Sequence, residues 1–405
     1  MSDDFHQQGD PFPHPLIEGQ ATTKLSESQR LRGLIAVLAS LMAAGITFGT
    51  SVPLLSLLLE RRGISTSMIG LNTSMPVLAT VLFSPFIPSI VARFGTYRSM
   101  MAGIALIIVS FLLLPVFQSL EMWFVLRFLI GIGMSVHWIV SETWLNSATT
   151  STNRGLYAGL YATLMGAGFA AGPVLLTFIG IDGWTPFFII TGAIALAAIP
   201  LTLAIDCAPK LEMSAPSERW SAIRKAPTIF IAVFVSGLAE TNLMSLMPIY
   251  GLQMGLPQTE AVLLAAVAIA GAVCLQLPIG WLNDRMNRRT LLSASGLIGF
   301  AGALALPFIL EPEYLRWPVL FLWGGVAMGL YTIGLAELGD RFTNSALSGA
   351  NALYVMTYCI GSMAGPPIAG ALMDGFGPNG FPITLIAAFS VFLVMATLRT
   401  FTKKV

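Results

Sequence analysis

Glu240 is the acidic residue that lies deepest within an apolar stretch of this chain. It stands near the middle of residues 227–250 and is followed by Thr241 and Asn242. Removal from water disfavours the charged form of a carboxyl group, so a buried glutamate can bind and release a proton at physiological pH. We therefore expect Glu240, with Asn242 beside it, to exchange protons or to bind a solute. A structural hydrogen bond to a neighbouring helix is the alternative.

Arg127 and His137 are the candidate reactive groups of a second apolar stretch, residues 122–145. Of the 21 Lys and Arg residues, Arg127 is the one that we place inside such a stretch, about six residues from its start, where a charge is costly. It can orient an anionic group, or it can extend along the helix toward a nearby surface. His137 is a secondary candidate for proton transfer because imidazole titrates near neutral pH, although a lone histidine more often packs through a hydrogen bond.

Aromatic side chains accompany these groups. Their rings can stack against a flat organic molecule, but most such residues simply pack. The residues that we expect to line a binding cavity are Trp138, Tyr331, Tyr354 and Tyr358, with Tyr161 as a further member.

The elements that position these residues are membrane-spanning helices. The composition is 55% hydrophobic and 10% charged, which lies far outside the range of soluble domains. Apolar runs of about 20 residues, the length that crosses a bilayer, predict an all-α integral membrane protein with twelve transmembrane helices. They fall near residues 33–59, 67–91, 98–117, 122–145, 155–179, 183–206, 227–250, 257–281, 288–308, 314–340, 346–372 and 380–400.

The longest polar interval divides the chain into two halves. We expect a disordered tail at residues 1–30, a six-helix bundle at 31–206, a linker at 207–226 and a second bundle at 227–405. An even number of helices puts both termini on one side. Arg61, Arg62 and Arg316 fall in the loops of the other side, whereas most basic residues share the side of the termini. The positive-inside rule therefore predicts cytoplasmic termini in a multi-pass protein of the bacterial inner membrane.

A charged hinge occurs once in each half. The second copy is Gly280, Asp284, Arg285, Arg288 and Arg289, and the first retains Arg93, Gly95 and a displaced Arg98. We expect these residues to form a conformational latch, in which hinge arginines pair with carboxylates at nearby helix ends; solvated surface charge is the alternative. The carboxylates are Glu142, Glu337 and Asp340.

The hinge resembles the G-x-x-x-D-R-x-G-R-R signature of the major facilitator superfamily, with Asn287 in place of a glycine. The resemblance implies two pseudo-symmetric six-helix bundles around a central solute site. Residues 127–133 are similar to the fourth-helix motif R-x-x-Q-G-x-G, with Ile130 in place of the glutamine. A glycine pattern in residues 155–179 resembles the helix-bend motif of proton-coupled antiporters and has a partial copy in the second half. Its residues are Gly159, Gly168, Gly172, Pro173, Gly365 and Pro366.

The expected activity is secondary active transport of a small organic solute, coupled to protons and working by alternating access. Residues 141–146 are similar to a bacterial branch of the superfamily, which raises facilitative import of a planar aromatic nutrient such as riboflavin as an alternative. Drug or metabolite export is another, although residues 33–59 lack the acid that many drug exporters carry. A receptor or scaffold would leave the repeated hinge unexplained. Motifs for phosphate binding, metal ligation or catalysis are missing from the sequence, so we expect no enzyme activity, no cofactor, no nucleic acid partner and a monomer in the lipid bilayer.

Overall fold

The computed structural model describes residues 26–149, 154–208, 221–311, 313–342 and 344–402, and nearly all of them are helical. Within these residues, eleven apolar stretches are long enough to cross a membrane, and the last, Gly349–Leu398, includes most of α14 and most of α15. The prediction of twelve transmembrane helices in an all-α fold is thereby confirmed.

The helices form two groups along the chain. The first group is α1 (Glu27–Arg61), α2 (Thr66–Phe83), α3 (Ile87–Phe94), α4 (Thr96–Leu113), α5 (Leu120–Ala148), α6 (Arg154–Ile179) and α7 (Thr185–Leu203). A short α8 (Ser221–Lys225) precedes the second group. That group is α9 (Pro227–Ser245), α10 (Met247–Gln253), α11 (Gln258–Arg285), α12 (Arg288–Ile309), α13 (Glu313–Arg341), α14 (Asn344–Phe376) and α15 (Gly380–Thr402).

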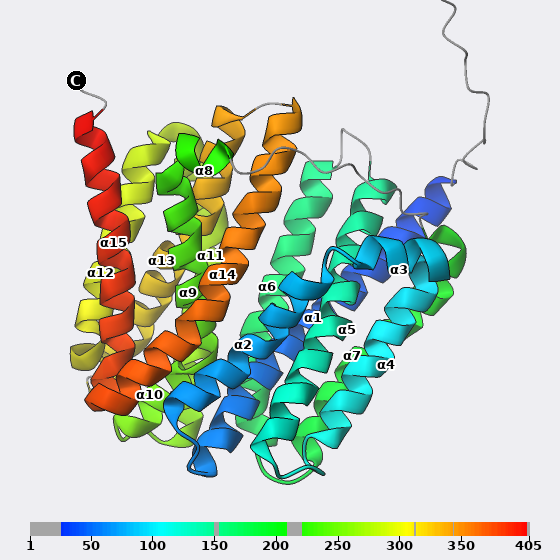
Figure 1. Cartoon of the computed structure of the whole chain (residues 1–405), viewed down its shortest axis with the longest axis horizontal. Helices are drawn as coiled ribbons and strands as arrows, with labels where there is room; N and C mark the ends of the chain where they lie inside the picture. The colour runs from blue at the N-terminus through cyan, green and yellow to red at the C-terminus, as the bar shows by residue number, and fades with distance from the viewer. Residues whose placement is uncertain (1–25, 150–153, 209–220, 312, 343, 403–405) are drawn as a thin grey trace, which may run out of the picture.

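We name the two ends of the bundle by the chain ends. The terminal end is the one where α1 begins and α15 finishes, and Figure 1 shows both at the top of the molecule. The distal end is the opposite one, where α1 finishes at Arg61 and α14 finishes at Phe376. Because successive long helices alternate in direction, the start of α2 also lies at the distal end.

Two predicted helices are each interrupted at or just before a proline, Pro85 in the first and Pro248 in the second. Residues 67–91 form α2 and α3, separated at Ser84, Pro85 and Phe86, and residues 227–250 form α9 and the first part of α10, separated at Leu246. Proline lacks a backbone N–H and disfavours the helical conformation of the residue before it. The second break lies just beyond Glu240 and Asn242.

The repeated glycine motif produces the same helix pairing in both halves. In the first half, a Cβ at Gly168 or Gly172 would collide with the backbone of α1, and the Thr50 hydroxyl donates to the Gly172 carbonyl oxygen at 3.3 Å. In the second half, Gly365 approaches the backbone of α9 at Leu238 in the same way. Small residues therefore let α6 pack on α1 and α14 pack on α9. Pro173 and Pro366 both lie inside continuous helices.

Gly159 differs from the other members of this motif. It is exposed, and no atom of another element lies within 4 Å of the position of its absent Cβ.

The expected domain boundaries fall partly outside the described residues. Most of the tail at 1–30 does, yet the first helix already begins at Glu27, where Ser26 and Gln29 form a capping box. Residues 209–220 of the expected linker at 207–226 are also outside. The described part of that linker includes α8, whose Ala222 packs in one apolar cluster with Phe230 of α9 and Leu353 of α14.

Candidate transport site

Tyr331 of α13 lies at the centre of a group of aromatic side chains in the second half. Its ring centroid is 5.3 Å from that of Tyr354 and 5.4 Å from that of Tyr358, both on α14. Glu240 of α9 is partly buried beside this group, and its carboxyl group lies near the Tyr358 hydroxyl. The structure thus brings together three predicted residues, Glu240, Tyr331 and Tyr358, from three different helices.

The first half supplies the facing side of this site. Tyr161 of α6 lies near Trp138 of α5 and within electrostatic reach of Glu142 of α5 and of Tyr331. Tyr331 in turn interacts electrostatically with both Glu142 and Glu240. Two carboxyl groups, one from each half, therefore lie within electrostatic reach of Tyr331.

Two of the predicted site residues lie in the packed interior instead. Tyr354 is fully buried, and its hydroxyl donates to the Tyr331 carbonyl oxygen at 2.6 Å. Asn242 is also fully buried, and its side-chain N–H donates to the Leu238 carbonyl oxygen at 3.0 Å. The contact of Tyr354 accounts for its position by packing, whereas the Asn242 side-chain oxygen has no hydrogen-bond partner among the described residues. A solute contact of either residue stays a prediction.

Arg127 of α5 is buried, with 2% of its surface exposed, and it does not reach the membrane surface by extending along its helix. Its Nε donates to the Asn72 carbonyl oxygen of α2 at 3.2 Å. The side chain lines a cavity of about 20 Å³ together with Thr73 of α2 and Thr241 of α9. This cavity lies between the halves and on the distal side of the tyrosines.

His137 is buried and faces α1, where its Nε2 lies 3.1 Å from the Ser40 hydroxyl oxygen. It lines a second, smaller cavity of about 10 Å³ with Trp138 and Met165. Trp138 is 40% exposed and lies on the same face of α5 as Glu142, which is also exposed. The face of α5 that points to the second half is therefore open toward the terminal end.

Asp374, at the last turn of α14, joins the halves at the distal end. One carboxylate oxygen accepts from the Thr66 backbone N–H at 2.7 Å and the other from the Ser67 backbone N–H at 3.0 Å. These are the first two N–H groups of α2, and Ser65, which precedes them, makes no side-chain cap. A carboxylate from one half thus caps a helix of the other half.

Further contacts at and near the distal end hold the same helices together. The Arg61 Nη2 group donates to the Gln258 side-chain oxygen at 2.8 Å, and the Ser74 hydroxyl donates to the Met363 carbonyl oxygen at 2.6 Å. A Cβ on Gly70 would overlap the Pro366 carbonyl group, which shows how closely α2 and α14 approach. Toward the terminal end, by contrast, Trp138 and Glu142 of α5 are exposed. The distal end is closed and the terminal end is open.

The hinge of the second half makes its ion pairs within that half. Arg288 donates to Asp340 at 2.5 Å and to the Ala336 carbonyl oxygen at 2.7 Å, which fastens the start of α12 to the end of α13. Glu337 pairs with Arg341, one turn away on its own helix. Arginine–carboxylate pairing at the hinge is therefore present, while the described residues show no such pair between the halves.

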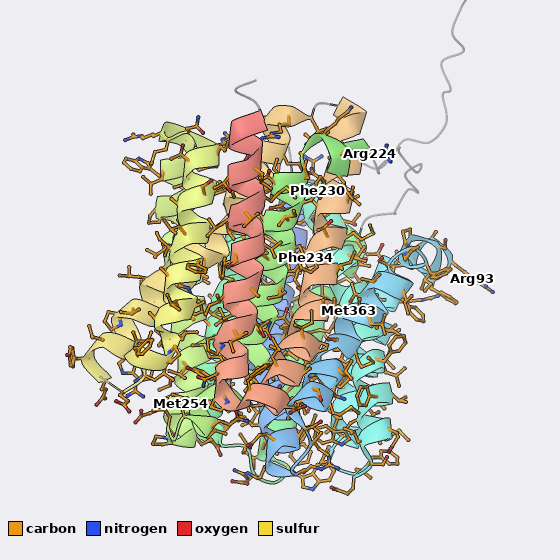
Figure 2. The ribbon with its side chains drawn as sticks, turned by 60° about the vertical axis from the view of Figure 1, so that its left-hand side comes forward. Arg93, Arg224, Phe230, Phe234, Met254 and Met363 are labelled. Atoms are coloured by element: carbon orange, nitrogen blue, oxygen red, sulfur yellow. The ribbon has the colours of Figure 1, made fainter. Side chains whose placement is uncertain are left out.

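The other hinge residues are exposed at the terminal end. Arg285 lies over the Trp281 ring at 4.0 Å, and Asp284 next to it is in no ion pair with another described residue. In the first half, Arg93 points away from the bundle (Figure 2). Gly95 has a positive φ of 87°, so it forms the tight turn between α3 and α4 just before Arg98.

Gly280 is not contacted by other elements, and Arg289 begins α12 beside Arg288. Asn287, which replaces the glycine of the expected signature, caps α12: its side-chain oxygen accepts from the Arg289 and Thr290 backbone N–H groups. The substitution therefore favours the start of a helix at this turn.

Comparison with known proteins agrees with this architecture. The family model described as Major Facilitator Superfamily matches residues 37–338 and 229–404. The chain belongs to the major facilitator superfamily. It is 29% identical to the uncharacterised MFS-type transporter YfkF of Bacillus subtilis (strain 168), with 87% of this chain and 92% of that protein covered. It is 24% identical to the uncharacterised MFS-type transporter Ent638_1421 of Enterobacter sp. (strain 638), over 90% and 95% of the two chains.

Solved structures of the same superfamily share the fold. A bacterial homologue of the human lysosomal transporter Spinster, in an inward-facing and occupied conformation, gives a TM-score of 0.74 at 16% identity, over 93% of this chain and 97% of that one. The nucleoside transporter NupG gives 0.72 at 14% identity, over 93% and 99%. These identities support the fold alone. The family match and the MFS-type relatives show that the chain is a multi-pass membrane transporter.

Sequence reasoning missed Asp374 and the hydroxyl-bearing wall of the Arg127 cavity. An acid at the end of an apolar stretch, directly before a glycine, was the available signal for Asp374. Nothing in the sequence pairs it with residues 66 and 67. Thr73 and Thr241 are ordinary residues in apolar helices, and only the packing of α2 and α9 beside α5 gives them a shared position.

Proposed function

We propose that this major facilitator is a proton-coupled secondary transporter of a small organic solute, and that Glu240 carries the coupling proton. One observation supports this most. Glu240 lies near Tyr358 and Tyr331 where the two halves face each other, and Tyr331 is within electrostatic reach of both Glu240 and Glu142 of the opposite half.

The coupling follows from the two carboxyl groups. The terminal end is open, so Glu142 and Glu240 stand on opposite sides of the space between the halves. Closing that end brings the halves together and moves the two groups closer. Like charges that approach favour protonation of one of them. A proton on Glu240 therefore favours closure of the terminal end, and its release favours opening, which links proton binding to alternating access.

The direction of the open side comes from the basic residues. The terminal end carries Arg93, Arg98 and the arginines of the second hinge, while Arg61, Arg62 and Arg316 lie at the distal end. We propose that the terminal end faces the cytoplasm of the inner membrane. The described conformation is then inward-open, with the outer side closed by the contacts of Asp374 and Arg61.

The test is Glu240→Gln in proteoliposomes, with a solute selected by thermal-shift screening of the purified protein. Glutamine keeps the shape of the protonated side chain, so the variant retains solute exchange and loses acceleration by a pH gradient. Glu313→Gln, an exposed position at the start of α13, is the matched control and keeps both activities. If Glu240→Gln shows gradient-driven uptake at the wild-type rate, the coupling proton binds another group, and His137 and Glu142 are the next candidates. Uptake that the gradient does not drive in either protein would indicate a uniporter.

The aromatic side chains between the halves favour one further candidate function, the facilitative import of a planar aromatic nutrient such as riboflavin. Trp138 and Tyr161 from the first half stand opposite Tyr331 from the second, and flat rings stack on such side chains. Uptake of riboflavin that saturates, shows counterflow and does not change with the pH gradient would select this function over proton coupling.

A further inference from the structure

We propose that the transported solute carries a carboxylate or a similar small anionic group, and that Arg127 binds this group at the closed apex of the path between the halves. The inference rests on one part of the proposed function, namely that a solute occupies this path. It does not depend on protons or on Glu240.

The first argument is that Arg127 has no acidic partner among the described residues. It is 2% exposed, and its hydrogen bond within the described residues uses Nε and a backbone carbonyl oxygen. Arg316 provides the comparison: it is 4% exposed and pairs with Glu260 at 2.7 Å. A buried arginine without a carboxylate is costly in a membrane protein and is expected to bind a charge that comes from elsewhere.

The second argument is the cavity beside the guanidinium group. The hydroxyl-bearing residues Ser51, Thr73 and Thr241 line it, and its volume of about 20 Å³ accepts one small polar group. Guanidinium has five N–H donors in a planar fork that matches a carboxylate. Thr241 comes from the second half and the other residues named here from the first, so the site is complete only when the halves meet at the distal end.

The third argument is the path from this cavity toward the open end. The Arg127 cavity and the smaller His137 cavity share Phe48 and Met134 as walls. Arg127, Met134 and Trp138 follow one another on α5, and Trp138 is about 16 Å from Arg127 along the helix at ~1.5 Å per residue. Methionine side chains adapt readily to a bound molecule. An anionic group at Arg127 therefore leaves the rest of the solute directed toward the aromatic residues, which favours an aromatic or apolar body.

The experiment compares sets of three molecules that share one skeleton and differ in charge. The probes are 3-phenylpropionate, its amide and 3-phenylpropylamine, with the corresponding set built on hexanoate, added to the purified full chain in thermal-shift and binding measurements. We expect the carboxylates to stabilise the wild type more than their amides or amines. Arg127→Gln should bind the carboxylates about 10- to 100-fold more weakly and abolish the preference, while Arg127→Lys should keep part of it because lysine retains the charge.

Thr73→Val keeps the shape of the cavity wall without its hydroxyl group and should weaken carboxylate binding by a smaller factor. It serves as the second variant if Arg127→Gln does not fold. A wild type whose carboxylates stabilise it no more than their amides overturns the anion site, as does an Arg127→Gln variant that keeps the wild-type preference. Either outcome leaves the Glu240 assignment standing, because that assignment is tested by the response of transport to a pH gradient.

Discussion

Removal of the Asp374 carboxylate should open the distal end. In the closed state this group accepts from the Thr66 and Ser67 backbone N–H groups at 2.7 and 3.0 Å. When the halves separate there, α2 loses its cap, since Ser65 makes none. The whole capping free energy therefore favours the closed state. Replacing a helix cap by alanine costs about 1 kcal/mol, within a range of roughly 0.5–2. Asp374→Ala should shift the ratio of open to closed distal ends by about fivefold.

The assay uses a cysteine at Thr66 in a background without Cys207, Cys274 and Cys359. Thr66 is 7% exposed and donates its backbone N–H to Asp374 at 2.7 Å, so Thr66→Cys retains this backbone contact. Labelling by a membrane-impermeant maleimide should become about fivefold faster in Asp374→Ala. Asp374→Asn should be intermediate, because asparagine still caps a helix without the charge.

The control for this measurement is Glu121→Gln. Glu121 is an exposed acid in the first turn of α5, at the same end of the bundle. Its loss removes the same charge without touching α2 or α14. Equal labelling rates in Asp374→Ala, Glu121→Gln and the wild type would refute the reasoning. So would faster labelling in both variants, because surface charge would then be the cause.

Three further predictions concern Gly70, Asp284 and Glu142. Gly70→Val should hold the distal end open, because its side chain would overlap the Pro366 carbonyl group, and the Thr66 cysteine should label faster, with Gly192→Val on α7 as a control that meets no neighbour. Asp284→Asn should lower transport without reducing the amount of inserted protein, since an acid that is unpaired in the described state is available to pair when the terminal end closes; unchanged turnover and cysteine accessibility would reject that role. Glu142→Gln should flatten the pH dependence of transport measured in proteoliposomes, and an unaltered profile would separate Glu142 from the proton step.

The fold could be predicted because membrane-spanning helices depend on local properties. Length and apolar composition gave the twelve helices, and the repeated hinge and glycine motifs gave the two related halves. The breaks at Pro85 and Leu246 were missed because the apolar runs continue through them. Proline in a membrane helix either breaks it or is accommodated, as at Pro173, and packing by neighbouring helices decides which occurs.

The sequence indicated which residues are candidates for the site, but it did not indicate which partners those residues contact. Glu240, Arg127 and Trp138 were identified because charge or aromatic character is informative within an apolar helix. Which partners they meet depends on helix rotation. A buried arginine looks the same in sequence whether it is paired, as Arg316 is, or unpaired, as Arg127 is.

The hinge illustrates the same limit. Arg288 and Asp340 are joined as an arginine–carboxylate pair, as we expected, but both belong to the second half. Sequence spacing cannot distinguish a pair within one bundle from a pair between two. The Asp374 cap does join the two halves, but the sequence does not reveal it, because the partners of its carboxylate are backbone N–H groups and not particular side chains.

Solute uptake into proteoliposomes, with and without an imposed pH gradient, tests the central claim most directly when the wild type and Glu240→Gln are compared at equal protein density. Proton coupling through Glu240 predicts that the gradient accelerates the wild type alone, while both proteins exchange solute at comparable rates without a gradient. Equal acceleration of both proteins by the gradient would contradict the account.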